Sequence, residues 1–231
     1  MTRSQSHRPI PLGLTLLIAI FSALVALALS GAHHAHAATG ASHADAAQAP
    51  VSAASFALHT DMRRLWEEHV TWTRLAIISL TTDSPDTKAT VARLLRNQTD
   101  IGNAVKPFYG PAAGDKLTAL LRSHILIAAD LIAAAKEGDK AGVTGDQATW
   151  TANADRIAAL LASANPRFWP VGPMKAMLHD HLRLTTDEVL ARLTRHWAAD
   201  VAAYDKIHLQ ALHMADMLSN GIIRQFPARF R

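Results

Sequence analysis

The chain has 231 residues, with 23 lysines and arginines against 19 aspartates and glutamates, and no cysteine. Without cysteine there is no disulfide bond and no cysteine nucleophile, so a folded domain must be held by packing alone. The basic excess is small and no lysine/arginine cluster with interleaved aromatic residues occurs, so a nucleic-acid partner is not expected. The length suits one domain with a sizeable core.

The N-terminal segment has the features of a secretory signal peptide. An uncharged apolar run over 12–32 follows two arginines and ends in the small-residue sequence AHA at 35–37. We predict a signal peptide over 1–37, cleaved after Ala37, and a flexible leader over 38–55. The mature protein would be exported, either periplasmic or secreted. The alternative is an uncleaved N-terminal membrane anchor, because the apolar run is long enough to cross a bilayer.

The remaining residues, 56–231, predict a single all-α domain. Apolar residues recur every three or four positions, the spacing that gives a helix one core-facing stripe. The predicted helices span 55–80, 85–109, 112–136, 146–164, 174–182 and 186–225. No strand pattern occurs, so we expect an up-and-down helical bundle with a long C-terminal helix.

One local pattern occurs three times. The segments 65–70, 120–125 and 177–182 each place an apolar residue four positions before a histidine, and a valine, isoleucine or leucine directly after it. This pattern predicts three helices that each turn one imidazole into the core. The inward histidines are His69, His124 and His181, with His208 on the last helix as a fourth. Other polar residues are expected in the same layer: Asn97, Gln98, Asp100, Asn153 and Tyr204.

Two interpretations of this polar layer remain open. In the first, amides, carboxylates and Tyr204 satisfy the histidines, and the layer only sets helix register. In the second, imidazoles and a carboxylate on facing helices bind a small polar ligand or a transition metal ion, namely zinc, iron, copper or nickel. Asp205 and His208 are three residues apart, as in the Glu-x-x-His motif of di-iron bundles, but the second pair of a di-iron site is missing. The candidate metal ligands are His69, His124, His181, Asp205 and His208.

Motifs of the common enzyme classes are missing, including Gly-x-Ser-x-Gly, a Gly-rich phosphate loop and His-Glu-x-x-His. We therefore expect a non-catalytic binding or sensing module of the cell envelope, with the polar layer as its ligand site. The alternative is a structural or partner-interaction module whose polar layer only sets helix register. An enzyme with an unfamiliar site is the least favoured class.

Several segments resemble an uncharacterised family of bacterial helical proteins. The similar segments are 65–79 (LWEEHVTWTRLAIIS), 94–110 (LLRNQTDIGNAVKPFYG), 120–134, 150–161 and 204–227 (YDKIHLQALHMADMLSNGIIRQFP). Some members carry names such as glycosyltransferase or acetylglutamate kinase, but this sequence has neither a nucleotide-binding loop nor alternating strands. The resemblance implies a helical domain and carries over no catalytic residue.

Overall fold

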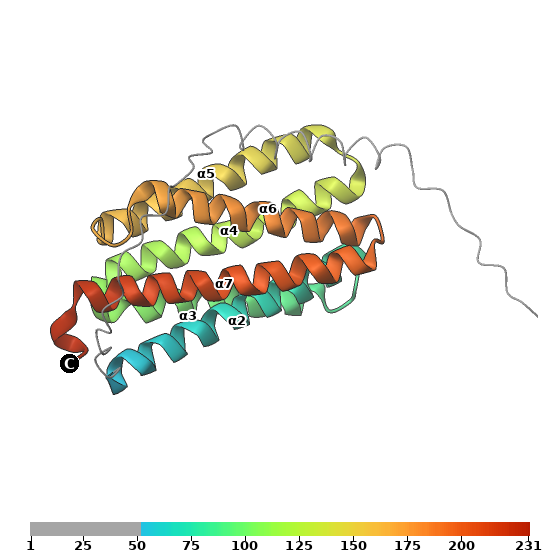
Figure 1. Ribbon diagram of the computed structural model, residues 1–231. Helices are drawn as coiled ribbons and strands as arrows, with labels where there is room; N and C mark the ends of the chain where they lie inside the picture. The colour runs from blue at the N-terminus through green and yellow to red at the C-terminus, as the bar shows by residue number, and fades with distance from the viewer. Residues whose placement is uncertain (1–51) are drawn as a thin grey trace, which may run out of the picture.

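The computed structural model describes residues 52–231, which form long helices joined by short turns (Figure 1). The helices are α2 (Ala53–Thr82), α3 (Thr87–Tyr109), α4 (Pro111–Glu137), α5 (Lys140–Ala164), α6 (Val171–Leu193) and α7 (Trp197–Gln225), followed by the short 3₁₀ helix η1 (Pro227–Arg229). No strand occurs in this described range, so the predicted all-α class is confirmed. The predicted signal peptide and most of the predicted leader lie outside the described residues.

The turns have recognisable end signals. Gly110 and Gly138 follow α3 and α4 with φ of 83° and 74°, a backbone conformation that glycine adopts at little cost. Asp139 then caps α5, because its carboxylate accepts hydrogen bonds from two backbone N–H groups of the first turn at 3.1 and 3.0 Å. This cap starts α5 at Lys140, before the predicted start at 146, so most of the segment between the two predicted helices is helical.

The start predicted for the long C-terminal helix, at residue 186, is wrong. Its first turns are continuous with the predicted short helix over 174–182, and together they form α6; the chain turns at 194–196 before α7 begins. Thr185, directly before the predicted start at 186, lies inside α6, and its hydroxyl donates to the carbonyl of His181 at 2.9 Å. The domain therefore consists of three helical hairpins: α2–α3, α4–α5 and α6–α7.

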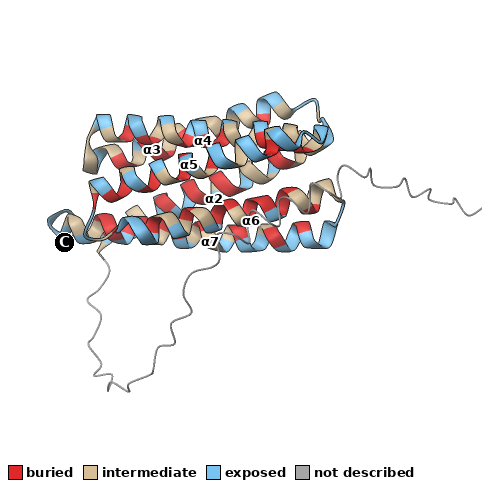
Figure 2. Cartoon of the chain, turned by 90° about the horizontal axis from the view of Figure 1, so that it is seen from above, coloured by how far each residue is buried: buried red, intermediate tan, exposed pale blue. Residues whose placement is uncertain are grey.

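The three hairpins close into a ring. Each helix packs against the next in the chain, and α7 also packs against α2 (Figure 1). The first helices of the hairpins, α2, α4 and α6, run in the same direction, and α2 contacts both of the others. Buried residues lie on the faces that the helices turn toward one another (Figure 2). Corresponding positions of the three hairpins are thereby brought to the same level of the bundle.

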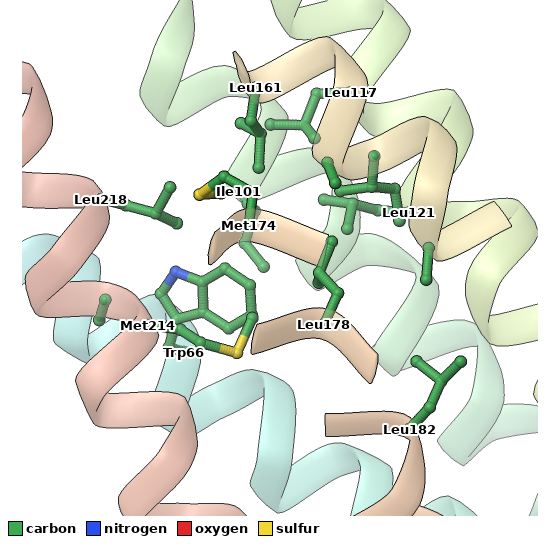
Figure 3. Close-up of a cluster of buried hydrophobic side chains, with 14 of the residues drawn as sticks. Trp66, Ile101, Leu117, Leu121, Leu161, Met174, Leu178, Leu182, Met214 and Leu218 are labelled. Atoms are coloured by element: carbon green, nitrogen blue, oxygen red, sulfur yellow. The ribbon is translucent and has the colours of Figure 1, made fainter. Parts of the chain in front are cut away.

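Large apolar side chains fill much of the interior. The cluster in Figure 3 includes Trp66, Ile101, Leu121, Met174 and Leu178, all at most 6% exposed. Burying a side chain of this size stabilises the fold by about 1.5–3 kcal/mol. A chain without disulfides depends on such packing for its stability.

Among the described helices, only α4 is long and apolar enough to cross a membrane by length and composition. A core helix of a soluble bundle can have the same properties. Here α4 packs between α3 and α5 and turns Leu117, Leu121, Leu131 and Ile132 into the core.

Candidate functional site

The three repeated histidines meet in the core of the bundle. His69 on α2, His124 on α4 and His181 on α6 are only 4 or 5% exposed. The ring centroid of His181 lies 5.9 Å from that of His69 and 6.4 Å from that of His124. The indole rings of Trp66 and Trp150 flank the cluster, 5.5 Å from His69 and 5.2 Å from His124. The prediction of one inward imidazole on each of three helices is confirmed.

Each imidazole is held by a side-chain amide from the second helix of its own hairpin. The amide always comes 29 residues after the histidine, and we call each pair a histidine–amide clasp. The distances from Nδ1 to the amide are 2.9 Å for His124 and Asn153, 3.1 Å for His181 and Gln210, and 3.1 Å for His69 and Gln98. Sequence reasoning missed Gln210; the constant spacing of 29 residues is the signal that could have found it.

The amides of the second and third hairpins also bind the backbone of the first helix. Nδ2 of Asn153 donates to the carbonyl of Leu120, and Nε2 of Gln210 donates to that of Met177, both at 3.1 Å. Because a carbonyl oxygen can only accept, these bonds leave the amide oxygen facing Nδ1 of the histidine. Nδ1 therefore carries the proton in both rings, and Nε2 is a hydrogen-bond acceptor.

His69 adopts the other tautomer. Nε2 of Gln98 donates to the carbonyl of Leu94 at 3.0 Å and to Oδ1 of Asn97 at 3.1 Å, and it also faces Nδ1 of His69. Asn97 is fixed in turn by a 3.0 Å bond from its Nδ2 to the carbonyl of Leu65. Since an amide nitrogen cannot accept a hydrogen bond, Nδ1 of His69 cannot donate to Gln98, and the proton of this ring is placed on Nε2.

The outer nitrogens of the three rings make no hydrogen bond to the described part of the chain. The two nitrogens lie on opposite sides of an imidazole, so a clasp at Nδ1 turns Nε2 away from the amide of its own hairpin. Between residues 52 and 231, the hydrogen bonds of these rings are all made at Nδ1. The cluster thus presents two Nε2 acceptors, on His124 and His181, and one Nε2 donor, on His69.

Burial keeps the three imidazoles uncharged at neutral pH. It lowers the pKa of His124 to about 3 and the pKa of His69 well below its ordinary value, and it also lowers the pKa of His181. The neighbouring imidazoles add to the effect on His69 and His124, because two positive charges would repel at this distance. The hydrogen bond that Nδ1–H of His181 donates to Oε1 of Gln210 opposes the lowering of the His181 pKa without overcoming it.

Two predicted metal ligands lie away from this cluster. His208 is half-buried on α7, and its Nε2 is 3.3 Å from Oε1 of Glu67 at the surface of the bundle. The expectation that His208 belongs to the buried layer is wrong, because the preceding residue, Ile207, takes the core-facing position. Asp205, three residues earlier, is exposed.

Two predicted polar-layer residues are also separate from the histidines. Tyr204 is half-buried and its ring lies under the guanidinium of Arg74, at 5.1 Å, while Asp100 is half-buried on α3. The predicted amides, by contrast, are fully buried. Over the described part of the chain, no group of three or more histidine, aspartate or glutamate side chains is arranged to hold a metal ion. The structure therefore does not bring the five predicted metal ligands together.

A second buried polar cluster lies beside the turn between α6 and α7. Asp200 accepts two hydrogen bonds from Arg74, at 2.5 and 3.0 Å, and one from Arg192 at 3.1 Å. Arg74 also donates to Glu188 at 2.7 Å, and the two carboxylate side chains are only 1 and 2% exposed. Sequence reasoning missed this cluster. Its signal is that Glu188 lies seven residues after His181, on the same core-facing stripe.

The two carboxylates of this cluster titrate differently. Burial raises the pKa of Glu188 to about 7, and its one bond from Arg74 does not compensate. Burial also opposes ionisation of Asp200, but the bonds from Arg74 and Arg192 outweigh it and lower the pKa of Asp200. The cluster therefore holds one carboxylate that stays ionised and one that gains or loses a proton near neutral pH.

No family model, no curated protein and no solved structure matches this chain. The resemblance to uncharacterised bacterial helical proteins therefore stays a prediction. Fold and site together define the class that can be stated: an all-α bundle of three helical hairpins with one histidine–amide clasp in each.

Proposed function

We propose that the protein is a non-catalytic structural or partner-interaction module of the cell envelope, in which the histidine–amide clasps set the register of the helices. The observation that carries this proposal is the repetition of the clasp: three hairpins, each with a buried histidine bound at Nδ1 by an amide 29 residues later. Each clasp joins the two helices of a hairpin at one relative height. Buried polar groups that satisfy one another can specify helix alignment in this way.

Export of the protein from the cytoplasm is part of the same proposal. It rests on the uncharged apolar run over 12–32 and the small-residue sequence at 35–37, which are typical of a signal peptide. N-terminal sequencing of the protein recovered from the periplasm or the medium tests it, with Ala38 as the expected first residue. Recovery from the cytoplasm with an intact N-terminus would contradict it.

Replacing one whole clasp by apolar residues tests the register function. We expect the double variant His124→Leu/Asn153→Leu to stay helical with an unfolding free energy no lower than that of the wild type, because no buried polar group is left half-paired. We also expect broadened or doubled amide NMR signals along α4 and α5, since register is no longer specified. The control, Ile125→Leu/Ile157→Leu, changes the same two helices but keeps the clasp. Equally sharp signals in both variants would contradict the proposal.

A second candidate function is the binding of a transition metal ion or a small polar ligand, and the uncommitted Nε2 atoms favour it. Metal-bound imidazoles commonly donate their other ring N–H to an oxygen, as His124 and His181 do. His69 departs from this pattern, because its proton lies on Nε2. The ring centroids, at 5.9 and 6.4 Å, are also farther apart than the roughly 5.3 Å expected around one tetrahedral zinc. This function therefore ranks second.

Elemental analysis separates the two candidates. The mature protein would be purified without a histidine tag and titrated with zinc, copper, iron and nickel. Under the register proposal, bound metal stays far below one equivalent, and the ions change the melting temperature equally in the wild type and in His124→Ala. About one equivalent that is lost in His124→Ala but kept in His213→Ala, an exposed position, would replace the register proposal with metal binding.

A further inference from the structure

An apolar cavity of about 40 Å³ lies one helical turn beyond the histidines. Thr73, Ala128 and Thr185 line it, and each of them is four residues after the histidine of its hairpin. All three hairpins therefore contribute the equivalent position, which places the cavity on the common axis of the bundle, directly next to the histidine layer.

The lining is apolar although it contains threonines. The hydroxyl of Thr73 donates to the carbonyl of His69 at 2.8 Å, and that of Thr185 donates to the carbonyl of His181 at 2.9 Å. Both hydroxyls are thus satisfied within their own helices. The remaining lining is aliphatic apart from Thr186 and the indole of Trp150.

Small side chains keep this cavity open. Ala76, Ala128 and Ala129 line it, and none of them can reach across the axis. A second cavity of about 30 Å³ lies on the other side of the histidine layer, but its lining includes Met177 and Met214 (Figure 3 labels Met214). Flexible methionines fill irregular gaps easily. The alanine-lined cavity is therefore the one that persists as a defined space.

We propose that the alanine-lined cavity is a binding site for a small uncharged apolar molecule of two or three heavy atoms, the size of a diatomic gas such as dioxygen. A cavity needs about 10–15 Å³ to hold a single water, and this one, at about 40 Å³, has roughly three times that minimum, which suits a molecule of two or three heavy atoms. Cavities with apolar walls stay dry and take up apolar guests such as xenon. Five of the lining residues are half-buried and form the part of the wall nearest to solvent: Thr73, Leu80, Val91, Ala128 and Ala129.

Xenon is the probe for this site, and methyl NMR of the full chain is the readout. In the wild type we expect saturable shifts of the methyl signals of Ile77, Leu94 and Val189. In Ala128→Val the added methyls fill the space, and we expect xenon binding to weaken by about tenfold or more. Valine has the shape of the threonines at the two equivalent positions, so the backbone accommodates it. Ala119→Val, an exposed position on the same helix, should leave xenon binding unchanged.

The absence of saturable shifts in the wild type would overturn the proposal, as would equal xenon binding in Ala128→Val and the wild type. Should Ala128→Val fail to fold, Ile77→Val carries the test, because it enlarges the cavity by one methyl group and should tighten xenon binding. Unchanged binding in Ile77→Val would overturn the proposal in the same way. None of these outcomes depends on the histidine–amide clasps, so the register proposal stands or falls separately.

Discussion

Nδ1 of His124 lies 2.9 Å from Oδ1 of Asn153, and the same amide donates from Nδ2 to the carbonyl of Leu120. One side chain thus ties α5 to two points of α4 that are a helical turn apart. These hydrogen bonds join residues of the same hairpin, and they lie in the buried centre of the bundle. Their removal has consequences that can be measured.

We expect Asn153→Leu to lower the unfolding free energy by about 2–4 kcal/mol, because it leaves the buried Nδ1–H of His124 without an acceptor. Urea unfolding followed by circular dichroism at pH 7 measures the change. Asn103→Leu on the exposed face of α3 is the control and should stay within about 0.5 kcal/mol of the wild type. A variant at position 153 as stable as this control would show that the clasp contributes nothing.

The buried histidines make the fold sensitive to acid. Their pKa values are lowered in the folded protein, whereas the unfolded chain takes up protons below about pH 6.5. Stability is therefore fully present above that pH and is lost as the pH falls. Each imidazole that stays neutral in the fold contributes up to about 1.4 kcal/mol per pH unit below 6.5. Glu188, whose pKa is raised to about 7, opposes this loss, so we expect the unfolding free energy to fall as the pH drops, by less than the three histidines would give alone.

Urea unfolding at a series of pH values between 7.5 and 5.5 measures this loss. His213→Gln, which removes an exposed histidine, should reproduce the wild-type profile. An unfolding free energy that stays flat from pH 7 to 5.5 would mean that the three imidazoles are not held neutral by burial.

The contribution of Glu188 to the unfolding free energy should have the opposite pH dependence to that of the histidines. Its folded pKa of about 7 lies above the ordinary value of 4.5, so its contribution is present below pH 4.5 and is lost as the pH rises through 7. Glutamine at this position cannot titrate. We expect the unfolding free energy of Glu188→Gln, relative to the wild type, to rise by about 2.5 kcal/mol between pH 5 and 8. A constant difference over this range, in the same urea series, would indicate an unshifted carboxylate.

Replacing a helical glycine by alanine should change the stability in opposite directions at two positions, Gly102 and Gly145. A Cβ at Gly102 would meet the hydroxyl of Thr118 and lie 2.7 Å from the carbonyl oxygen of Gly114, where α3 and α4 cross closely. Gly102→Ala should therefore cost about 1–3 kcal/mol. A Cβ at Gly145 has no atom within 4 Å, so Gly145→Ala should stabilise α5 by up to about 1 kcal/mol. Thermal unfolding compares the two, and equal effects would place the α3–α4 crossing in doubt.

Most of the helices could be predicted from apolar periodicity, but the break between α6 and α7 could not. The stripe continues in phase across the turn, through Leu193, Trp197 and Val201, and the turn contains neither glycine nor proline. The chain instead reverses at Arg195, whose φ is 61°. Trp197 and Val201 lie on this stripe, which is expected to face the core, but they are more than half exposed as a result of the turn.

The candidate site, too, could be predicted only in part from the sequence. Three histidines with the same local sequence were recognisable, because each lies on the apolar stripe of its helix. Their partners depend on pairing between two helices, so single-helix patterns identify Asn153 but miss Gln210. The Glu188–Arg74 contact joins residues 114 positions apart. The local pattern marks Glu188 as core-facing but does not identify Arg74 as its partner.

The ring formed by the hairpins has a consequence for how the chain could be ordered. Asp216 near the end of α7 accepts from Arg63 near the start of α2, so the last hairpin adjoins the first as it adjoins its other neighbour. Around the ring, each hairpin packs against the hairpin on either side of it. A circularly permuted gene that starts with α4 or α6 and links α7 to α2 would encode the same set of neighbours, with all three clasps still inside unbroken hairpins.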